Sequence, residues 1–212
     1  GVDDGVDLSG NPVASLFVSL PAGADDAIIE DDGTPNNDAW RIRSTTGTFE
    51  STSFQIPSAS LTFNTDGDTV AISSFDYSAS TGPASITLNG TGGVNTFRLS
   101  AGERIADGSA LILSGNAVFD LDGFTETLAS LSGAASGTSV ALGAGTLVLS
   151  GASGSTTYLG SITGSGNLSK TGGATQTLSG NNTYTGTTLL SGGTLNAGVT
   201  TAFSPASIMI VN

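Results

Sequence analysis

The sequence predicts an all-β protein built as a parallel β-helix, in which short strands stack into a solenoid. Gly, Ser and Thr supply 90 of the 212 residues, and Pro or Gly interrupts the chain often. The longest stretch free of both, residues 68–81, is rich in Thr, Ser, Val and Phe, which are poor helix formers. Short strand-like segments and a recurring Leu-Ser-Gly tripeptide indicate the same architecture.

Six short segments have the composition of strands. Each is apolar or alternates apolar and polar residues, and turns such as Asn89-Gly90 and Asp66-Gly67 bracket them. The predicted strands are residues 60–64, 69–73, 84–88, 95–99, 110–113 and 146–149. A β-sandwich would show similar strands, so the architecture has to be inferred from repetition.

Leu-Ser-Gly begins at residues 113, 131, 149, 178 and 190. Such imperfect repetition is typical of a solenoid in which each coil keeps an inward Leu and a corner Gly while its loops vary. Stacked coils bring equivalent side chains to about 4.8 Å, where like charges repel by roughly 1 kcal/mol even in water. The stretch from Thr127 onward, whose one charged residue is Lys170, has the composition that such stacking favours.

The charge of the chain argues against several classes of partner. Eighteen acids against five bases give a net charge of -13, and a phosphate-binding surface needs clustered bases. We therefore expect no nucleic-acid partner. The chain has neither Cys nor His, which removes thiolate catalysis and the commonest zinc ligands, and it has no apolar run long enough to span a bilayer.

Residues 167–198 closely resemble the autotransporter-associated β-strand repeat of bacterial passenger proteins. The resemblance rests on a set of matching positions that includes Lys170, Leu178, Ser179, Gly180, Asn182, Tyr184 and Gly186. It implies a right-handed parallel β-helix that is exported to the bacterial cell surface. We assign residues 58–212 to this helix and residues 1–57, which hold the only Trp and most of the acids, to an acidic cap or small β module.

An acidic stretch over residues 24–38 is a candidate Ca²⁺ site. Its oxygen-bearing side chains surround a Gly-Thr-Pro turn, and Ca²⁺ prefers oxygen ligands. The candidate ligands are Asp31, Asp32, Asn36 and Asp38. A solvated acidic loop is the alternative, because the spacing fits no EF-hand. No other cofactor is expected.

Charged residues at 98–126 provide an enzymatic alternative, since polysaccharide cleavage needs two carboxylates or a cation with a nearby base. The candidates are Arg98, Glu103, Arg104, Asp107, Asp120, Asp122 and Glu126. A charged outer face explains these residues equally well. We therefore predict a protein without enzymatic activity.

The apolar segment Ile208, Met209, Ile210 and Val211 is a predicted assembly edge. An unprotected strand edge pairs with an available strand, either a further coil of the chain or another subunit. The resulting prediction is an extracellular structural or adhesive solenoid, a stalk or fibre subunit that stacks end to end. A passenger module that binds surface glycans or host proteins is the alternative.

Overall fold

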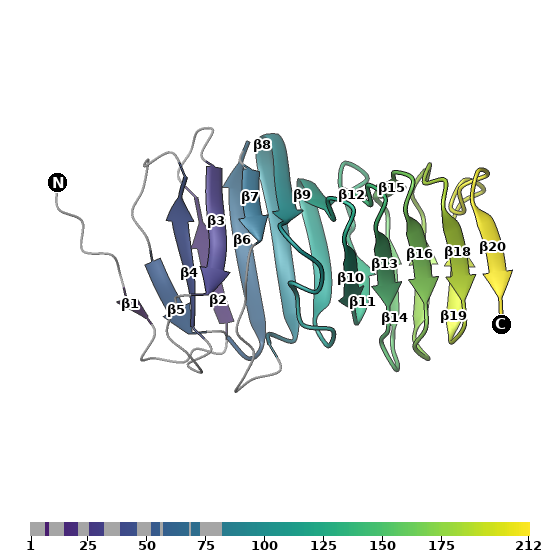
Figure 1. Cartoon of the computed structure of the whole chain (residues 1–212), viewed down its shortest axis with the longest axis horizontal. Helices are drawn as coiled ribbons and strands as arrows, with labels where there is room; N and C mark the ends of the chain where they lie inside the picture. The colour runs from purple at the N-terminus through teal and green to yellow at the C-terminus, as the bar shows by residue number, and fades with distance from the viewer. Residues whose placement is uncertain are drawn as a thin grey trace.

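The computed structural model describes residues 7–8, 15–20, 26–31, 39–45, 52–55, 57–67, 69–72 and 82–212. All regular elements of these ranges are strands, and most pairs are parallel, so the structure is a β-solenoid. The rungs follow one another along the long axis, from the N-terminal end to β20 (Figure 1). About 6 turns are stacked in this way.

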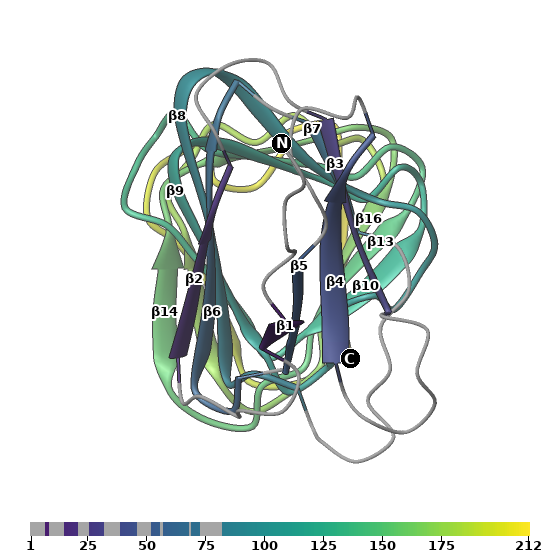
Figure 2. The ribbon, with the colours of Figure 1, turned by 90° about the vertical axis from the view of Figure 1, so that its left-hand side faces the viewer.

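The strands form three walls around a flattened ring, seen along the axis in Figure 2. Wall 1 contains β2 (Ser15–Ser19), β6 (Ser60–Asp66), the first parts of β8 (Ser85–Leu99) and β9 (Ala110–Asp120), β11 (Ser130–Ser132), β14 (Ser155–Tyr158), β17 (Thr175–Leu178) and β19 (Thr194–Ala197). Wall 2 contains β3 (Asp26–Asp31), β7 (Thr69–Ile72), the last parts of β8 and β9, β12 (Ser139–Ala141) and β15 (Ser161–Thr163). Wall 3 contains β10 (Thr125–Leu128), β13 (Thr146–Leu149), β16 (Asn167–Lys170), β18 (Thr187–Leu190) and β20 (Ile208–Val211).

Inward side chains stack in register along each wall. On wall 1, Leu61, Ile86, Leu111 and Leu131 form one fully buried ladder. On wall 2, the ladder is Val70, Phe97, Phe119, Val140 and Ile162. Since apolar burial contributes about 25 cal/mol per Å², these ladders are the main stabilising element of the fold. Four of the six predicted strand segments lie within observed strands. Residues 84–88 begin one residue before β8, and the described part of residues 69–73 is β7, since Ser73 lies outside the described residues.

The pairing register gives the length of a coil. In wall 3, equivalent residues of successive rungs are 20 or 21 positions apart, whereas the first three Leu-Ser-Gly tripeptides are 18 positions apart. Leu131 stacks on Leu111 rather than on Leu113, and Leu149 belongs to a different wall. The tripeptide therefore occurs on more than one wall. It indicated a solenoid correctly, but it did not give the length of a coil.

The N-terminal strands join the same twelve-stranded sheet as wall 2 and the part of wall 1 up to β11. β2 and β3 pair in parallel with β6 and β7. β4 (Ala39–Ser44) and β5 (Thr52–Gln55) then continue antiparallel from β3, and β1 (Asp7–Leu8) pairs in parallel with β5. The boundary predicted at residue 57 thus falls inside one continuous sheet.

Wall 1 has a seam between β11 and β14, which are joined by a single bridge from Gly133 to Tyr158. The amide of Gln176, on the next rung, reaches across this seam to the backbone of Leu131. Its Nε2 donates to the Leu131 carbonyl at 2.9 Å, and its Oε1 accepts from the Leu131 N–H at 3.3 Å. Thr156 Oγ1 also donates to Oε1 at 2.9 Å. A buried side chain thereby replaces missing strand pairing.

We expect Gln176→Leu to lower the free energy of unfolding by about 2–4 kcal/mol. The substitution leaves a buried N–H and a buried carbonyl of Leu131 without their partner, and each such group costs about 1–3 kcal/mol. Urea unfolding measures the change. Thr177→Val, on the same strand, is the control and should cost less than about 0.5 kcal/mol. Equal effects of the two substitutions would contradict this role of Gln176.

Candidate functional site

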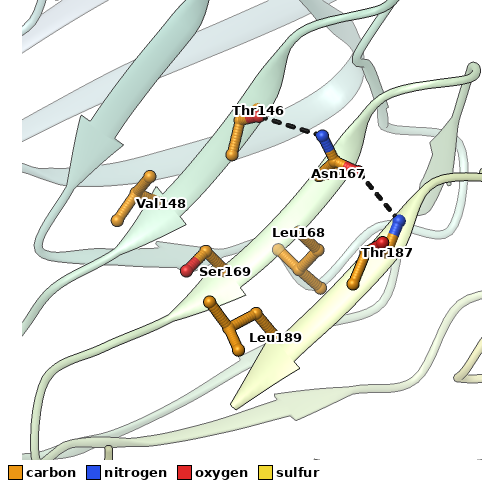
Figure 3. Close-up of a pocket in the computed structure, with 7 residues that line it drawn as sticks. All are labelled: Thr146, Val148, Asn167, Leu168, Ser169, Thr187 and Leu189. Carbon is orange, nitrogen blue, oxygen red and sulfur yellow. Dashed lines mark hydrogen bonds between the residues drawn. The ribbon is translucent and has the colours of Figure 1, made fainter. Parts of the chain in front are cut away.

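A shallow groove crosses the outer face of wall 3. Its volume is about 360 Å³. It is lined by Thr146, Val148, Asn167, Leu168, Ser169, Thr187 and Leu189, which come from β13, β16 and β18 (Figure 3). None of these side chains ionises in the physiological range. The groove can therefore offer apolar contact and neutral hydrogen bonds.

Asn167 lies at the centre of the polar row, and both ends of its amide are engaged. Its Oδ1 accepts the backbone N–H of Thr187 at 2.8 Å, and its Nδ2 donates to Thr146 Oγ1 at 3.3 Å (Figure 3). The amide thus joins three successive rungs. Sequence analysis did not identify this row, because only the true coil length of 20 or 21 residues places these three residues in line.

The residues that carry the family resemblance lie inside the solenoid or where its rungs approach closely. Lys170 ends β16 in an inward ladder between Leu149 and Leu190, with 1% of its surface exposed. Its Nζ donates to the carbonyl of Gly172. Burial lowers the pKa of Lys170 from its ordinary value. The only lysine is therefore an inward, hydrogen-bonded side chain.

Asn182 joins one rung to the two beside it. Its Oδ1 accepts the Ile162 N–H at 2.7 Å, and its Nδ2 donates to the Ala202 carbonyl on the following rung. Tyr184 is fully buried, and its hydroxyl lies 2.6 Å from Thr188 Oγ1. Both predicted motif residues therefore have contacts within the solenoid.

The remaining motif positions lie where successive rungs approach closely. Leu178 is fully buried between Tyr158 and Ala197. Ser179 donates its backbone N–H to the Tyr158 carbonyl at 2.8 Å. At Gly180 and Gly186, a Cβ would overlap a carbonyl oxygen of the preceding rung. Any larger side chain at these two positions would force the rungs apart.

The predicted assembly edge, Ile208–Val211, is β20, which pairs with β18. All four side chains are exposed, by 44–69%. Met209 and Val211 continue inward ladders over Thr188 and Leu190, while Ile208 and Ile210 continue the outward rows. The other edge of β20 has no paired strand among the described residues.

The structure does not describe the proposed Ca²⁺ site. Asp32, Asn36 and Asp38 lie outside the described residues, and Asp31 ends β3 with a side chain that is not described. Ca²⁺ binding at these residues stays a prediction.

The charged residues of the enzymatic alternative form two separate contacts. Arg98 and Asp120 are in-register neighbours of β8 and β9, and their Nε and Oδ2 atoms are 2.8 Å apart. Glu103 and Glu126 instead connect the loop before β9 to β10. Thr127 donates its backbone N–H to Glu103 Oε2 at 3.0 Å, and Glu126 accepts from the Arg104 and Ile105 N–H groups at 2.9 and 2.7 Å.

Glu126 is an inward carboxyl with no exposed surface, which the sequence pattern did not indicate. Burial raises the pKa of Glu126 to about 8. The nearby charges of Glu103 and Asp107 also raise this pKa, whereas the hydrogen bonds from the two backbone N–H groups lower it. A side chain without solvent access cannot reach a polysaccharide. The two glutamates instead cover the edge of wall 3 at β10.

We expect the free energy of unfolding to fall as pH rises from about 4.5 to about 8. In the unfolded chain Glu126 ionises near its ordinary pKa of 4.5, whereas in the folded chain it keeps its proton up to about 8. Its contribution to stability is therefore complete at low pH and is lost as pH rises through the folded pKa. Denaturant titrations at several pH values measure the slope.

Glu126→Gln should make that slope less steep, by up to about 1.4 kcal/mol per pH unit. Glu103→Gln is the control, because it removes a carboxylate from the same contact but keeps the buried carboxyl of Glu126. Parallel stability curves for the wild type and Glu126→Gln between pH 5 and 8 would show that Glu126 does not cause the dependence.

One part of the chain matches the model of a known repeat family. Residues 168–197 match the model of the passenger-associated-transport-repeat. No curated protein and no solved structure matches the chain significantly. Among the described residues, none forms a helix long and apolar enough to cross a membrane. The match covers β16 to β19, with Lys170, Leu178, Asn182 and Tyr184 inside it. The matched repeat and the β-solenoid that contains it together fit an autotransporter-passenger repeat family.

Proposed function

We propose that this chain is a rigid, non-catalytic structural segment of an autotransporter-type passenger, which acts outside the bacterial cell. The supporting observation is that side chains as well as backbones connect successive rungs. Asn167 and Asn182 each bond to the rung before and the rung after their own. A solenoid whose rungs are joined in this way resists bending, which suits a stalk that holds other modules at a distance.

The terminal strand supports a second part of this proposal, that the rod lengthens by adding rungs at β20. Met209 and Val211 lie on inward ladders and are exposed by 44% and 66%. A further parallel strand would bury both side chains and pair the open edge. That strand is supplied by a further coil or by another subunit.

Glycan binding in the groove of wall 3 receives less support from the geometry. A site for sugar hydroxyls needs polar groups that are not already paired, and the Asn167 amide is used within the sheet. An adhesive role would therefore require another surface of the protein.

Electron microscopy of the purified chain should show straight rods of uniform width, with longer rods at higher protein concentration. A variant with both Met209→Lys and Val211→Lys should give short rods alone, because an added rung would bury two charges. Ile208→Lys, which faces outward on the same strand, is the matched control and should still lengthen.

Flexible or globular particles would contradict the rigid rod, and rods of constant length at all concentrations would contradict addition at β20. The non-catalytic role has its own test, which is incubation with a panel of polysaccharides. Release of reducing ends would overturn that part of the proposal.

A further inference from the structure

The outer face of wall 3 carries two rows of side chains that run along the rod. One row is Thr125, Thr146, Asn167, Thr187 and Ile208; the other is Thr127, Val148, Ser169, Leu189 and Ile210. All ten are uncharged, and the rows become apolar toward the C-terminal end. Ile208 and Ile210 are 69% and 44% exposed, and Val148 and Leu189 are half-buried.

This face offers a partner apolar contact more than hydrogen bonds. The Asn167 amide is engaged on both sides, and Ser169 is buried in the second row. The accessible edges of the groove, formed by Val148 and Leu189, are therefore apolar (Figure 3). A partner with apolar side chains of matching shape would displace water from it.

The distribution of charge indicates which partner can approach this face. All 18 acids lie in residues 1–126, whereas residues 127–212 contain Lys170 alone, which is buried. Repulsion between two copies of a chain with net charge -13 is weakest where their C-terminal parts meet. An arrangement with antiparallel rods brings these parts together and directs the two acidic parts away from each other.

We propose that wall 3 is a self-association surface, at which two copies of this chain pack face to face about a twofold axis with their rods antiparallel. Leu189 of each copy packs on the groove of the other. Ile208 and Ile210 lie over Thr125 and Thr127 at the opposite end of the same rows, as in two aligned sheets about 10 Å apart. This inference is independent of rung addition at β20, since it uses outward instead of inward side chains.

The size of the face makes this contact weak and reversible. Five rungs about 4.8 Å apart, each about 13 Å long, cover roughly 300 Å² per partner. Stable complexes bury about 800 Å² per partner. We therefore expect a dissociation constant of about 0.1 mM.

Sedimentation equilibrium up to about 1 mM protein tests the proposal. The wild type should form dimers, and a variant with Leu189→Lys and Ile210→Lys should lose at least about tenfold in affinity. A milder variant with Thr at both positions should also weaken the dimer, which guards against misfolding by the charged one. Thr163→Lys adds a charge to the outward face of wall 2 and should have no effect.

The orientation has a separate readout, because the chain contains no cysteine. Under oxidation, Thr125→Cys of one copy should link to Ile208→Cys of a second copy, since these two positions lie at opposite ends of the same row. Preferential linking of Thr125→Cys to itself would overturn the antiparallel arrangement.

A monomer up to about 1 mM, or a dimer unaffected by the Leu189 and Ile210 variants, would overturn the surface itself. Loss of the dimer with Met209→Lys and Val211→Lys alone would also overturn it, in favour of pairing at the β20 edge.

Discussion

The structure depends on one constraint, that parallel rungs stack in register at about 4.8 Å, so each side chain lies against its own counterparts. Apolar counterparts fill the interior, as Phe97 and Phe119 do on wall 2. Like charges would repel in such a ladder, and the observed charged neighbours, Arg98 and Asp120, have opposite signs. Glycine is required where rungs come closest, as at Gly180. The composition of the chain is a direct consequence of this spacing.

Polar side chains complete the stack where backbone pairing is interrupted. Gln176 bonds to the backbone of Leu131 across the seam in wall 1, and Glu126 bonds to two backbone N–H groups beside the first strand of wall 3. Asn182 bridges the rungs on either side of it. Each of these side chains is buried and occupies an interior position. They make the solenoid continuous and therefore suit a structural role better than a ligand site.

Sequence reasoning could predict the fold class and the strands, because short apolar segments and the avoidance of charge both follow from stacking. The spacing of the Leu-Ser-Gly tripeptides does not give the coil length, since Leu131 and Leu149 belong to different walls. Sequence reasoning also could not predict the burial of Glu126, whose partners are backbone groups that leave no pattern in the sequence. The groove was missed for a related reason, because its rows become visible only after the register is known. The matched family unit, residues 168–197, runs from β16 to β19 and so exceeds one coil of 20 or 21 residues.

Distances between pairs of spin labels on one outward row test the in-register stacking most directly. Thr125 and Ile208 are separated by four rungs, and Thr146 and Ile208 by three. Measured by pulsed electron paramagnetic resonance in dilute, monomeric protein, the first pair should be about 19 Å apart and the second about 14 Å, a difference of one rung. Equal distances for the two pairs, or a longer distance for the second pair, would contradict a stack of parallel rungs along one axis.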